Sequence, residues 1–446
     1  MRLSTRVYRS LPGVLRGPVR RSATRKISFA EIGDLHCYPA NEDDFLMPDR
    51  PLPALWDGLG QERVQINRGG EGGPHWIECE TEPGYFARLN GVTLFPRWGI
   101  VSPRPGVFLS ESAKAASWLR PDLRGIPGVV RGDTGPRILR RSPKVWIAGP
   151  HLSLMHAGGY NYGHWLVDCL PGAIAFLSEL REGRLKLAAP PLSGWQARTL
   201  ILLGVPPGGV SEVLRPAVRC ADLVFSSLHG MRDRVRHDAF IRLTTQRIAE
   251  GETLYPKREP VLSPGRGARV PDIMGSSLVR GVFDTLRASV DPPRTGPQII
   301  YVSREGVITS RRMTNEAELV SALEGRGATI VHPEDLTIDE QIRTFSNARV
   351  IIGPIGAGLS NMGFAPPGCS IVEILPSNCT DVWNLNLASI VRHRYAYVLA
   401  SVPEGQITPV DVGGVVRDWV RFDFQAPIRR VVDTVERILE GTRMAL

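Results

Sequence analysis

The stretch RVIIGPIGAGLSNMGFAPPGCSIVEILP (349–376) decides the fold class of this sequence. It opens and closes with short runs rich in Ile and Val that are apolar throughout, as strands buried on both faces of a sheet are. Between these runs, three glycines lead into a helical stretch. A buried strand, a connection and the next buried strand form the repeating unit of a parallel sheet covered by helices. The sequence therefore predicts an α/β protein.

The same alternation continues on both sides of this stretch. Short apolar runs and amphipathic helical stretches follow one another at 298–305, 315–327, 328–333, 337–348, 381–393 and 395–400. This order predicts several parallel strands with helices on both faces of the sheet. A last amphipathic stretch, PIRRVVDTVERILEG (427–441), predicts a helix near the end of the chain.

The first part of the chain has a more mixed pattern. Residues 31–82 show no clear period and are interpreted as irregular, whereas Asn90-Gly91 and Pro105-Gly106 lie within alternating apolar and polar residues and predict hairpins. One or two strands are expected at 144–155, and a helix at 163–180 that Pro171 and Gly172 would kink or restart. From 185 to 250, apolar runs alternate with helical stretches, which again indicates α/β structure.

Residues 252–275 are rich in proline and glycine and predict a hinge in this segment or shortly after it. We therefore divide the chain into a basic and disordered arm over 1–30, a first α/β lobe with some N-terminal β-hairpins over 31–270, and a second α/β lobe over 275–446. The last helix is expected to pack on the second lobe or back on the first. Two such lobes leave a central cleft, where ligands bind in folds of this kind.

The net charge of +9 is concentrated in the arm. Residues 1–30 carry eight basic and no acidic side chains, so the rest of the 446 residues is close to neutral. The arm is interpreted as solvated and disordered, or as a segment that docks on an anionic membrane surface. An Arg-rich organellar transit peptide also fits its composition. The near-neutral body and the lack of an aromatic and basic platform argue against a nucleic-acid binder.

The lengths of the apolar runs and the spacing of the cysteines indicate the compartment of the protein. No stretch reaches the 18 or more apolar residues of a membrane span, and no secretory signal is visible, so we expect a soluble or peripheral protein. The six cysteines include no C-x-x-C pair and no histidine at zinc-finger spacing. Reduced thiols in the cytoplasm are therefore expected, without a disulfide framework or a zinc site.

The glycine turn in the second lobe is a candidate anion site. In GPIGAGLSN (353–361), a predicted buried strand runs into Gly356, Ala357 and Gly358 and then a helical stretch. Backbone amides at such a helix start can approach a phosphate without obstruction by a Cβ atom. Tight packing explains a glycine turn equally well. The turn is not a Walker loop, and its spacing does not match G-x-G-x-x-G.

Polar residues at the ends of other predicted strands add to this candidate site. Arg304, Arg311 and Arg312 follow one strand, where guanidinium groups are suited to bidentate phosphate contact, although surface arginines in a loop are the alternative. Asn315 also fits an ordinary helix N-cap. Glu373 lies within a buried run, and a buried carboxylate needs a partner, either a ribose hydroxyl pair or a backbone amide.

The candidate reactive pair lies in the first lobe, in NYGHWLVDCLP (161–171). His164 and Asp168 are four residues apart, so a helix places them on one face, where the carboxylate can orient the imidazole. Such a pair can remove a proton from a hydroxyl, although a lone His-Asp pair also occurs as a structural feature. No Ser or Cys lies in a hydrolase elbow, and the metal-diphosphate signature D-x-D is absent.

These motifs, in this order over about residues 85–400, resemble glycosyltransferase family 61, the capsular polysaccharide biosynthesis type. The family joins a strand-end Arg, a second Arg before Asn-Glu, a Glu-Gln helix, a Gly-Ala-Gly turn and a Val-Glu-Ile/Leu strand. The matching residues are Arg304, Arg311, Asn315, Glu316, Gln341, Gly356, Ala357, Gly358 and Glu373. The His-x-x-x-Asp of the family matches through His164 and Asp168.

The resemblance implies a GT-B-like fold, in which two Rossmann-like lobes face a central cleft. The first would be the acceptor side, and the second would bind a nucleotide-sugar donor, most simply UDP-linked. It implies inverting sugar transfer to a glycan or lipid-linked acceptor in polysaccharide biosynthesis, without a cofactor or metal. The catalytic residues would be His164 and Asp168. The donor-binding residues would be Arg304, Arg311, Asn315, Gly356, Ala357, Gly358, Asn361 and Glu373.

One position departs from the family. A histidine usually precedes Gly-Ala-Gly, but this chain has Ile355, which cannot form a hydrogen bond through its side chain. Either Arg312 or another donor group compensates, or the donor differs, or activity is lost. An inactive glycan-binding or scaffold protein of the same fold is therefore the alternative function. For the enzyme we expect a cytoplasmic location, with peripheral contact to the inner face of the membrane through the basic arm.

Overall fold

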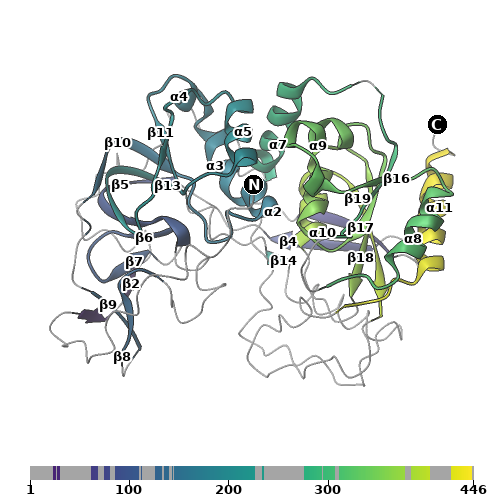
Figure 1. Cartoon of the computed structure of the whole chain (residues 1–446), viewed down its shortest axis with the longest axis horizontal. Helices are drawn as coiled ribbons and strands as arrows, with labels where there is room; N and C mark the ends of the chain where they lie inside the picture. Colours follow the sequence, from purple (N-terminus) through teal and green to yellow (C-terminus); the bar gives the residue numbers. More distant parts are fainter. Residues whose placement is uncertain are drawn as a thin grey trace.

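The computed structural model has two large β-sheets with helices between and around them, and two smaller sheets (Figure 1). It describes residues 24–26, 28–30, 62–68, 75–80, 86–109, 112, 126–132, 135–139, 143, 145–226, 234–235, 276–293, 295–306, 311–376, 383–401 and 423–443. The expected helix near 236–250 and the hinge at 252–275 lie outside these residues, apart from the short strand β14 (Arg234–Val235) just before them.

The first sheet contains six strands in the order β12-β11-β10-β13-β5-β6. They are β5 (Phe86–Phe95), β6 (Ile100–Ser102), β10 (Trp146–Ser153), β11 (Lys186–Ala189), β12 (Val210–Glu212) and β13 (Val218–Ser226). The four strands from β10 to β13 are parallel, and β5 and β6 extend the sheet antiparallel. Parallel strands joined by helices are what the α/β pattern of this part predicts.

The second sheet contains eight strands in the order β14-β4-β3-β19-β18-β17-β15-β16. They are β3 (Glu62–Arg68), β4 (His75–Glu80), β14, β15 (Ile299–Val302), β16 (Thr329–Val331), β17 (Val350–Pro354), β18 (Ser370–Pro376) and β19 (Arg394–Ala400). The run from β3 to β16 is parallel throughout. The predicted parallel sheet of the second part is therefore confirmed.

Helices cover both faces of the second sheet. On its outer face, α8 (Glu316–Glu324) and α11 (Ile428–Arg443) pack through Leu319, Leu323, Val431 and Val435. On its inner face lie α7 (Ser276–Val290), α9 (Ile338–Phe345), the 3-10 helix η8 (Ala357–Phe364) and α10 (Trp383–Ile390). Side chains along β17 alternate between the two faces of the sheet. Val350 and Ile352 belong to the core on the outer face, and Ile351 belongs to the core on the inner face.

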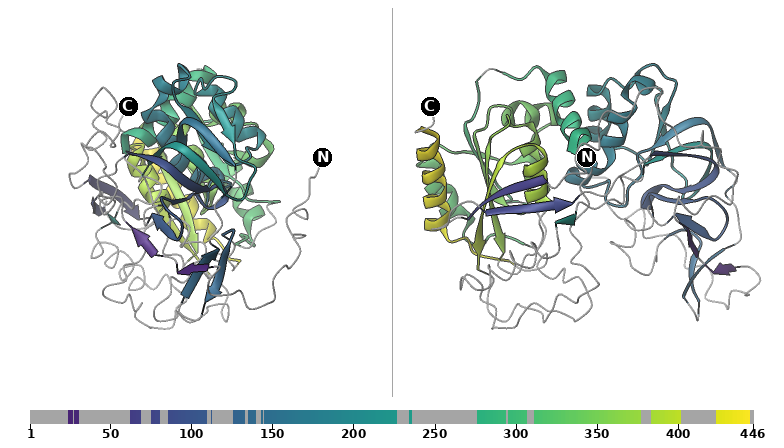
Figure 2. Two further views of the ribbon diagram at one scale, coloured as in Figure 1. Left: turned by 90° about the vertical axis from the view of Figure 1, so that its left-hand side faces the viewer. Right: turned by 180° about the vertical axis from the view of Figure 1, so that it is seen from behind.

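The first sheet contributes its own helices to the same inner layer. These are the helical run α2 (Tyr162–His164), η5 (Trp165–Cys169), α3 (Leu170–Ala175) and α4 (Leu177–Arg181), followed by α5 (Gly194–Leu202). Helix α7 packs against α3 and α5 on one side and against α9, α10 and η8 on the other. In the view from behind, helices of both halves meet in the middle of the molecule (Figure 2). One hydrophobic core therefore runs from the first sheet through α7 to the second.

Smaller elements surround the first sheet. Strand β1 (Thr24–Lys26) pairs with β9 (Gly135–Leu139), which pairs with β8 (Val129–Gly132), and β2 (Ser28–Ala30) pairs with β7 (Val107–Leu109). Short 3-10 helices lie at η4 (Pro96–Trp98) and η7 (Pro333–Asp335). The expected disorder of the basic arm is thus wrong for 24–26 and 28–30, which are paired strands.

Several sequence expectations need correction. Residues 62–68 and 75–80 are strands of the second sheet, not irregular, and they come from the segment that the sequence assigns to the first lobe. Asn90-Gly91 is not a hairpin turn, because β13 pairs with β5 on both sides of it. A turn at Pro105-Gly106 does occur, where the amide of Val107 donates to the carbonyl of Arg104.

The last helix packs on the second sheet and not back on the first. The apolar stripe of α11 contacts α8 and β18, which present the matching apolar outer face. Among the helices that the structure describes, none has the length and apolar character needed to cross a bilayer. Among the described residues, Cys169, Cys220 and Cys369 are buried free cysteines.

Candidate active site

The helical run that begins at Tyr162 carries the predicted His-Asp pair. Asn161 caps it, because its side-chain oxygen accepts hydrogen bonds from the amides of Gly163 and His164 at 3.0 and 3.4 Å. The next turn, Trp165–Cys169, is π-helical and contains Asp168. Single π-helical turns within a helix are frequent at functional sites. The sequence predicts the helix and its restart at Pro171 but not this widened turn.

His164 and Asp168 form the hydrogen-bonded dyad that their spacing predicts. The Nδ1 atom of His164 lies 2.5 Å from Oδ2 of Asp168. The aspartate side chain is 1% exposed and that of the histidine 20%. Burial raises the pKa of Asp168, and the hydrogen bond from His164 opposes this rise. A carboxylate at Nδ1 fixes the neutral imidazole with its proton on Nδ1, so Nε2 carries the lone pair that can accept a proton.

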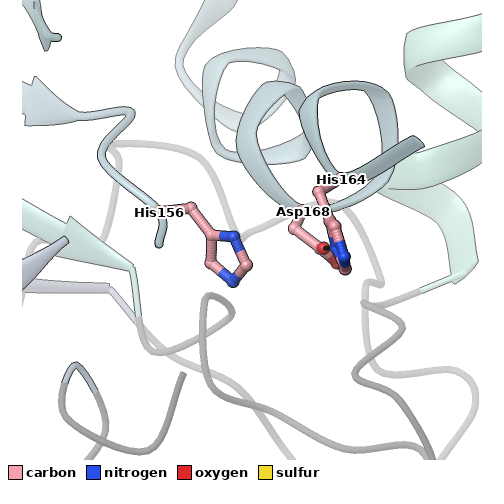
Figure 3. Close-up of side chains that lie close together, drawn as sticks. All are labelled: His156, His164 and Asp168. Atoms are coloured by element: carbon pink, nitrogen blue, oxygen red, sulfur yellow. Dashed lines mark hydrogen bonds and ion pairs between the residues drawn. The ribbon is translucent and has the colours of Figure 1, made fainter. Parts of the chain in front are cut away.

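A second histidine, His156, lies beside the dyad (Figure 3). Its ring centroid is 5.6 Å from that of His164, and the two ring planes differ by 36°. The amide of Gly158 donates to Nδ1 of His156 at 3.1 Å. A Cβ atom at Gly158 would lie 2.9 Å from Cδ2 of His164, so the space between the two rings requires glycine. The sequence analysis missed His156, for which the pair Gly158-Gly159 is the only local signal.

Residues from the second half of the chain contact the helical run that carries the dyad. The ring of Trp383 meets that of His164 edge-on, with 6.2 Å between the centroids. A Cβ atom at Gly163 would lie 2.7 Å from the hydroxyl of Ser360 and 2.8 Å from Trp383. Helix α2 therefore lies directly against η8 and α10. The structure thus brings the helix of the dyad against η8, which follows the glycine turn, and against Trp383, which carries no sequence signal.

Arg304 lies across the glycine turn. Its Nη1 atom donates to the carbonyl of Ile355 at 3.5 Å, and a Cβ atom at Gly356 would lie 2.2 Å from the same Nη1. Burial lowers the pKa of Arg304, while nearby Glu316 and Glu334 favour its charged form. Gly356 is extended, with φ of 167°, so glycine is needed there for this close approach and not for backbone strain. A partly buried guanidinium at the N-terminus of η8 is an arrangement that suits an anion.

Glu316 fixes the strand end that carries Arg304. Its Oε1 atom accepts hydrogen bonds from the hydroxyls of Tyr301 and Ser303 and from the amide of Arg304, at 3.0, 2.9 and 3.0 Å. Three donors on one buried carboxylate oxygen hold the end of β15 in place. The Glu of the Asn-Glu motif therefore positions Arg304 through the backbone.

The two other arginines differ from each other. Arg311 follows β15 with φ of 75°, a left-handed conformation that costs a residue other than glycine of order 1 kcal/mol or more. Arg312 is mostly exposed and pairs with Asp423, at 2.9 Å from Nη2 to Oδ2. Its own amide also donates to Asp423. Arg312 is thus engaged with the C-terminal segment, which argues against its compensating for Ile355.

Asn315 and Glu373 have protein partners. The amide side chain of Asn315 donates to the carbonyl of Ala426 and accepts from its N–H, both at 2.9 Å, so it ties α8 to the segment before α11. Glu373 is 1% exposed and accepts hydrogen bonds from Asn384 at 2.5 Å and from Tyr395. These contacts tie Asn315 to the segment before α11 and supply the buried Glu373 with two side-chain partners. The donor-binding role of both residues stays a prediction.

Asn361 and Ile355 are also built into the interior. Asn361 is fully buried; it accepts from the Tyr162 hydroxyl at 2.7 Å and donates to Gln341 at 2.9 Å and to the carbonyl of Gly358 at 3.1 Å. It therefore connects the two halves of the chain. Ile355 is 6% exposed and joins the hydrophobic core, so the position of the family histidine is a core position here. Gly358 packs on Val302, with a Cβ position 3.1 Å from that side chain.

His156, His164 and Asp168 place possible metal ligands within 4.8 Å of one another. The hydrogen bonds of this cluster fit a metal poorly. Nδ1 of His156 receives the Gly158 amide, which leaves its proton on Nε2, and Nδ1 of His164 is used by Asp168. A metal needs an unprotonated nitrogen from each histidine. In this arrangement the cluster offers one such nitrogen, Nε2 of His164, beside the carboxylate.

The first half thus carries a proton acceptor, and the second carries the partly buried Arg304 beside the glycine turn. Residues 162–372, just under half of the chain, match the model of the family Glycosyltransferase 61. The match includes the dyad, Arg304 and the glycine turn.

A β-1,2-xylosyltransferase of rice (Oryza sativa subsp. japonica) is 28% identical to this chain over 118 residues. The aligned part is 22% of this chain and 22% of the rice protein. The chain thus spans about a fifth of the length of this relative.

Proposed function

We propose that the protein is an inverting glycosyltransferase that moves a sugar from a nucleotide-sugar donor to a hydroxyl of a glycan or a lipid-linked acceptor, in the biosynthesis of a cell-surface or capsular polysaccharide. The observation that carries this proposal is the His164–Asp168 dyad on a helical run that packs against η8, the helix that follows the glycine turn. The family match over the same residues supports it. We also propose that the fold is GT-B-like, and that the first half of the chain binds the acceptor and the second half binds the donor.

The chemistry follows from the dyad. The acceptor hydroxyl gives its proton to Nε2 of His164 while its oxygen forms a bond to the anomeric carbon. The bond from that carbon to the diphosphate breaks, and the diphosphate leaves with the electron pair. Attack opposite the leaving group inverts the anomeric centre. Asp168 keeps the imidazole oriented and stabilises the imidazolium that forms.

In this proposal Arg304 and the backbone at Gly356–Gly358 stabilise the negative charge of the leaving diphosphate. Arg311 is the second proposed cation, and its left-handed backbone at the end of β15 supports a position set by function. These groups would replace a divalent ion in a metal-independent reaction.

Xylose is the first donor sugar to test, because the rice relative is a xylosyltransferase. The experiment incubates the whole chain with UDP-, GDP- and TDP-sugars and a panel of oligosaccharide acceptors, with EDTA present. We expect transfer with one donor, and a product whose anomeric configuration, read by NMR, is opposite to that of the donor. Absence of both transfer and thermal stabilisation by every nucleotide sugar would reject the proposal.

A matched pair of variants tests the dyad. His164→Gln should lower kcat by about 10²- to 10⁴-fold while donor affinity stays unchanged. His151→Gln removes another buried histidine of the first half, which bonds to Ser211 and Gly149 outside the site. It should keep kcat within about twofold. An inactive glycan-binding protein, the alternative function, would bind saccharides but no donor, and Arg304→Ala would leave its binding unchanged.

A cytoplasmic protein at the inner face of the membrane remains our proposal for the location. Deleting residues 1–23 should leave nucleotide binding intact and lower sedimentation with vesicles that contain anionic lipid. Unchanged sedimentation would reject a membrane role of the arm.

A further inference from the structure

We propose that Tyr160 and Trp195 form an aromatic surface that binds one sugar of the acceptor chain, next to the sugar that carries the reacting hydroxyl. This inference rests on the proposed function and deepens it, because it names where the acceptor binds and what it must be. Both residues would set acceptor affinity and specificity, and neither would take part in the chemical step.

Tyr160 is exposed although the turn that carries it is firmly held. Its side chain is 78% exposed, the highest value among the large hydrophobic side chains of the described residues. On either side of it, the amide of Gly159 donates to the carbonyl of His156 at 3.0 Å, and the amide of Asn161 donates to that of Gly158 at 2.8 Å. Single exposed apolar side chains are ordinary on a protein surface, but most need no such fixed backbone. This turn presents an aromatic ring to solvent in a defined place.

A buried glutamine joins the turn to the start of α5. Gln196 is 5% exposed, and its Nε2 atom donates to the carbonyl of Gly159 at 2.9 Å. Its Oε1 atom accepts from the amide and from the hydroxyl of Ser193, both at 2.9 Å. Tyr160 directly follows Gly159, and Trp195 directly precedes Gln196. The Gln196–Gly159 hydrogen bond therefore brings the two aromatic residues into neighbouring positions.

Trp195 is the outer member of an aromatic cluster. Its ring centroid is 5.5 Å from that of Tyr162 and 6.2 Å from that of Trp165, with the latter ring edge-on. Trp165 is fully buried and donates to the hydroxyl of Thr199 at 2.9 Å, whereas Trp195 is only partly buried. Buried rings thus hold Trp195 in place and leave part of it at the surface. A ring held in this way needs little ordering when a ligand binds.

The chemistry of this surface suits a neutral sugar. A pyranose ring presents C–H bonds on its faces and hydroxyls around its rim. The negative face of an aromatic ring attracts weakly positive C–H groups, and the tyrosine hydroxyl can bond to a rim hydroxyl. Neither Tyr160 nor Trp195 brings a positive charge, which a site for the anionic donor would need. The occupant is therefore a sugar of the acceptor chain.

The position of the surface relative to the dyad fits this role. Tyr160 precedes His164 by four residues, which limits the distance between their Cα atoms to about 14 Å. The turn also packs on the dyad helix, because a Cβ atom at Gly159 would lie 3.2 Å from the sulfur of Cys169. A short saccharide chain spans such a distance. A sugar on Tyr160 can therefore continue to one whose hydroxyl reaches His164, on the half of the chain proposed to bind the acceptor.

The test compares acceptors of two lengths in the full chain. The probes are xylo-, manno- and gluco-oligosaccharides of one and of four sugars, with the donor that supports transfer. Tyr160→Ala should lower kcat/KM for the four-sugar acceptor by about fivefold to thirtyfold and leave the one-sugar value and the donor Kd unchanged. Tyr160→Phe keeps the ring and should recover most of the four-sugar value. Leu214→Ala, at a side chain 75% exposed, is the control and should change neither value.

Trp195→Ala should lower the same four-sugar value. A full four-sugar value in either alanine variant, or an equal loss with both acceptor lengths, would overturn the proposal. Urea unfolding of Tyr160→Ala should match that of the wild type, because the side chain is exposed, so a lost preference for the longer acceptor reports binding and not folding.

A second measurement does not depend on turnover. In ¹H–¹³C spectra of tyrosine-labelled protein, the ring signal of Tyr160, assigned by its absence in Tyr160→Phe, should shift with a four-sugar probe and not with UDP. A signal that stays in place would overturn the proposal. So would self-association in sedimentation velocity that Tyr160→Ala abolishes, because the occupant would then be a second copy of the chain.

Failure of the proposed function can be told apart from failure of this inference. If the wild-type chain transfers no sugar, the proposed function fails and this inference fails with it. Transfer by the wild type, together with a Tyr160→Ala variant that is equally active on the four-sugar acceptor, removes this inference alone.

Discussion

The hydroxyl of Tyr162 donates a 2.7 Å hydrogen bond to the side-chain oxygen of Asn361. Tyr162 begins the helical run that carries the dyad, and Asn361 lies in η8, behind the glycine turn. Asn361 continues to Gln341 on α9, whose amide reaches the carbonyl of Leu336. Burial raises the pKa of Tyr162, so the hydroxyl stays protonated as a donor. A polar chain of three side chains therefore sets the position of the proton acceptor relative to the anion site.

Tyr162→Phe should weaken this connection. The variant leaves the oxygen of Asn361 without its donor in a buried position, which costs about 1–3 kcal/mol. Urea unfolding should show this loss, and kcat should fall while donor affinity changes little. Tyr160→Phe is the control, because Tyr160 is 78% exposed and lies two residues away. Equal stability of the two variants would contradict the role of this hydrogen bond.

Gly356→Ala should affect the anion site more than the fold. The backbone at this position suits alanine, but the new Cβ would occupy the place of Nη1 of Arg304, 2.2 Å away. The flexible guanidinium should move aside at little cost in stability. We expect weaker donor binding in isothermal titration, of a size similar to that in Arg304→Ala.

The double variant should bind the donor no worse than either single variant, because both remove the same contact. Gly172→Ala serves as the control, since a Cβ there meets nothing within 4 Å and a helical alanine is favoured. Additive losses in the double variant would show that Gly356 acts apart from Arg304.

Phe283→Ala in α7 should destabilise both halves together. Phe283 is 1% exposed and meets the ring of Phe364 edge-on at 5.1 Å between centroids. Truncation of such a ring costs about 3–5 kcal/mol. Hydrogen exchange should lose protection to a similar extent in β10 and β17, because one core joins the sheets.

Leu214→Ala, at a side chain 75% exposed, should change stability by less than about 0.5 kcal/mol. Loss of protection confined to one sheet in Phe283→Ala would mean that the two halves unfold separately.

His393 should make stability depend on pH. Burial lowers its pKa to about 4, and its Nε2–H donates to the carbonyl of Met362 at 2.8 Å. The unfolded chain binds a proton near pH 6.5, so stability is complete above that pH and falls as the pH approaches 4. Between pH 7 and pH 5 the loss should be about 2 kcal/mol by urea unfolding. His393→Gln, which can donate but does not titrate here, should lose correspondingly less over this range.

The sequence predicts β15 to β18 of the second sheet well because these strands are short runs rich in Ile and Val between helical stretches. Strands β17 and β18 and helices α9 and α11 confirm this pattern. The sequence predicts less of the first part of the chain, because the pairing of strands that are distant in the sequence determines the structure there. Asn90-Gly91 has hairpin chemistry, but β13 holds both sides of it in one strand, with φ of +63° at the glycine. Strands β3 and β4 depend on β19, hundreds of residues away.

Prediction of the site is limited in the same way, because spacing indicates only contacts between residues that are close in the sequence. The His164–Asp168 bond is local, four residues along a helix, and spacing alone predicts it. The partners of Asn361 and Glu373 come from Tyr162, Asn384 and Tyr395, which no spacing rule connects to them. Both residues have protein partners, and their contact with the donor stays a prediction. Motif reading finds polar residues in a buried region but cannot distinguish a ligand contact from an internal one.

The pairing of β3 with β19 has a consequence for how the chain folds during synthesis. Tyr395 lies opposite Ile66, although more than 300 residues separate them. The second sheet cannot be completed until nearly the whole chain has left the ribosome, and such long-range pairing is slow. During that interval β3 would have only β4 beside it, and β4 only β3 and the two-residue strand β14, a small ribbon that is marginally stable alone. The nascent protein should therefore depend on chaperones, and a fragment beginning near residue 275 would expose the edge of β19 and tend to aggregate.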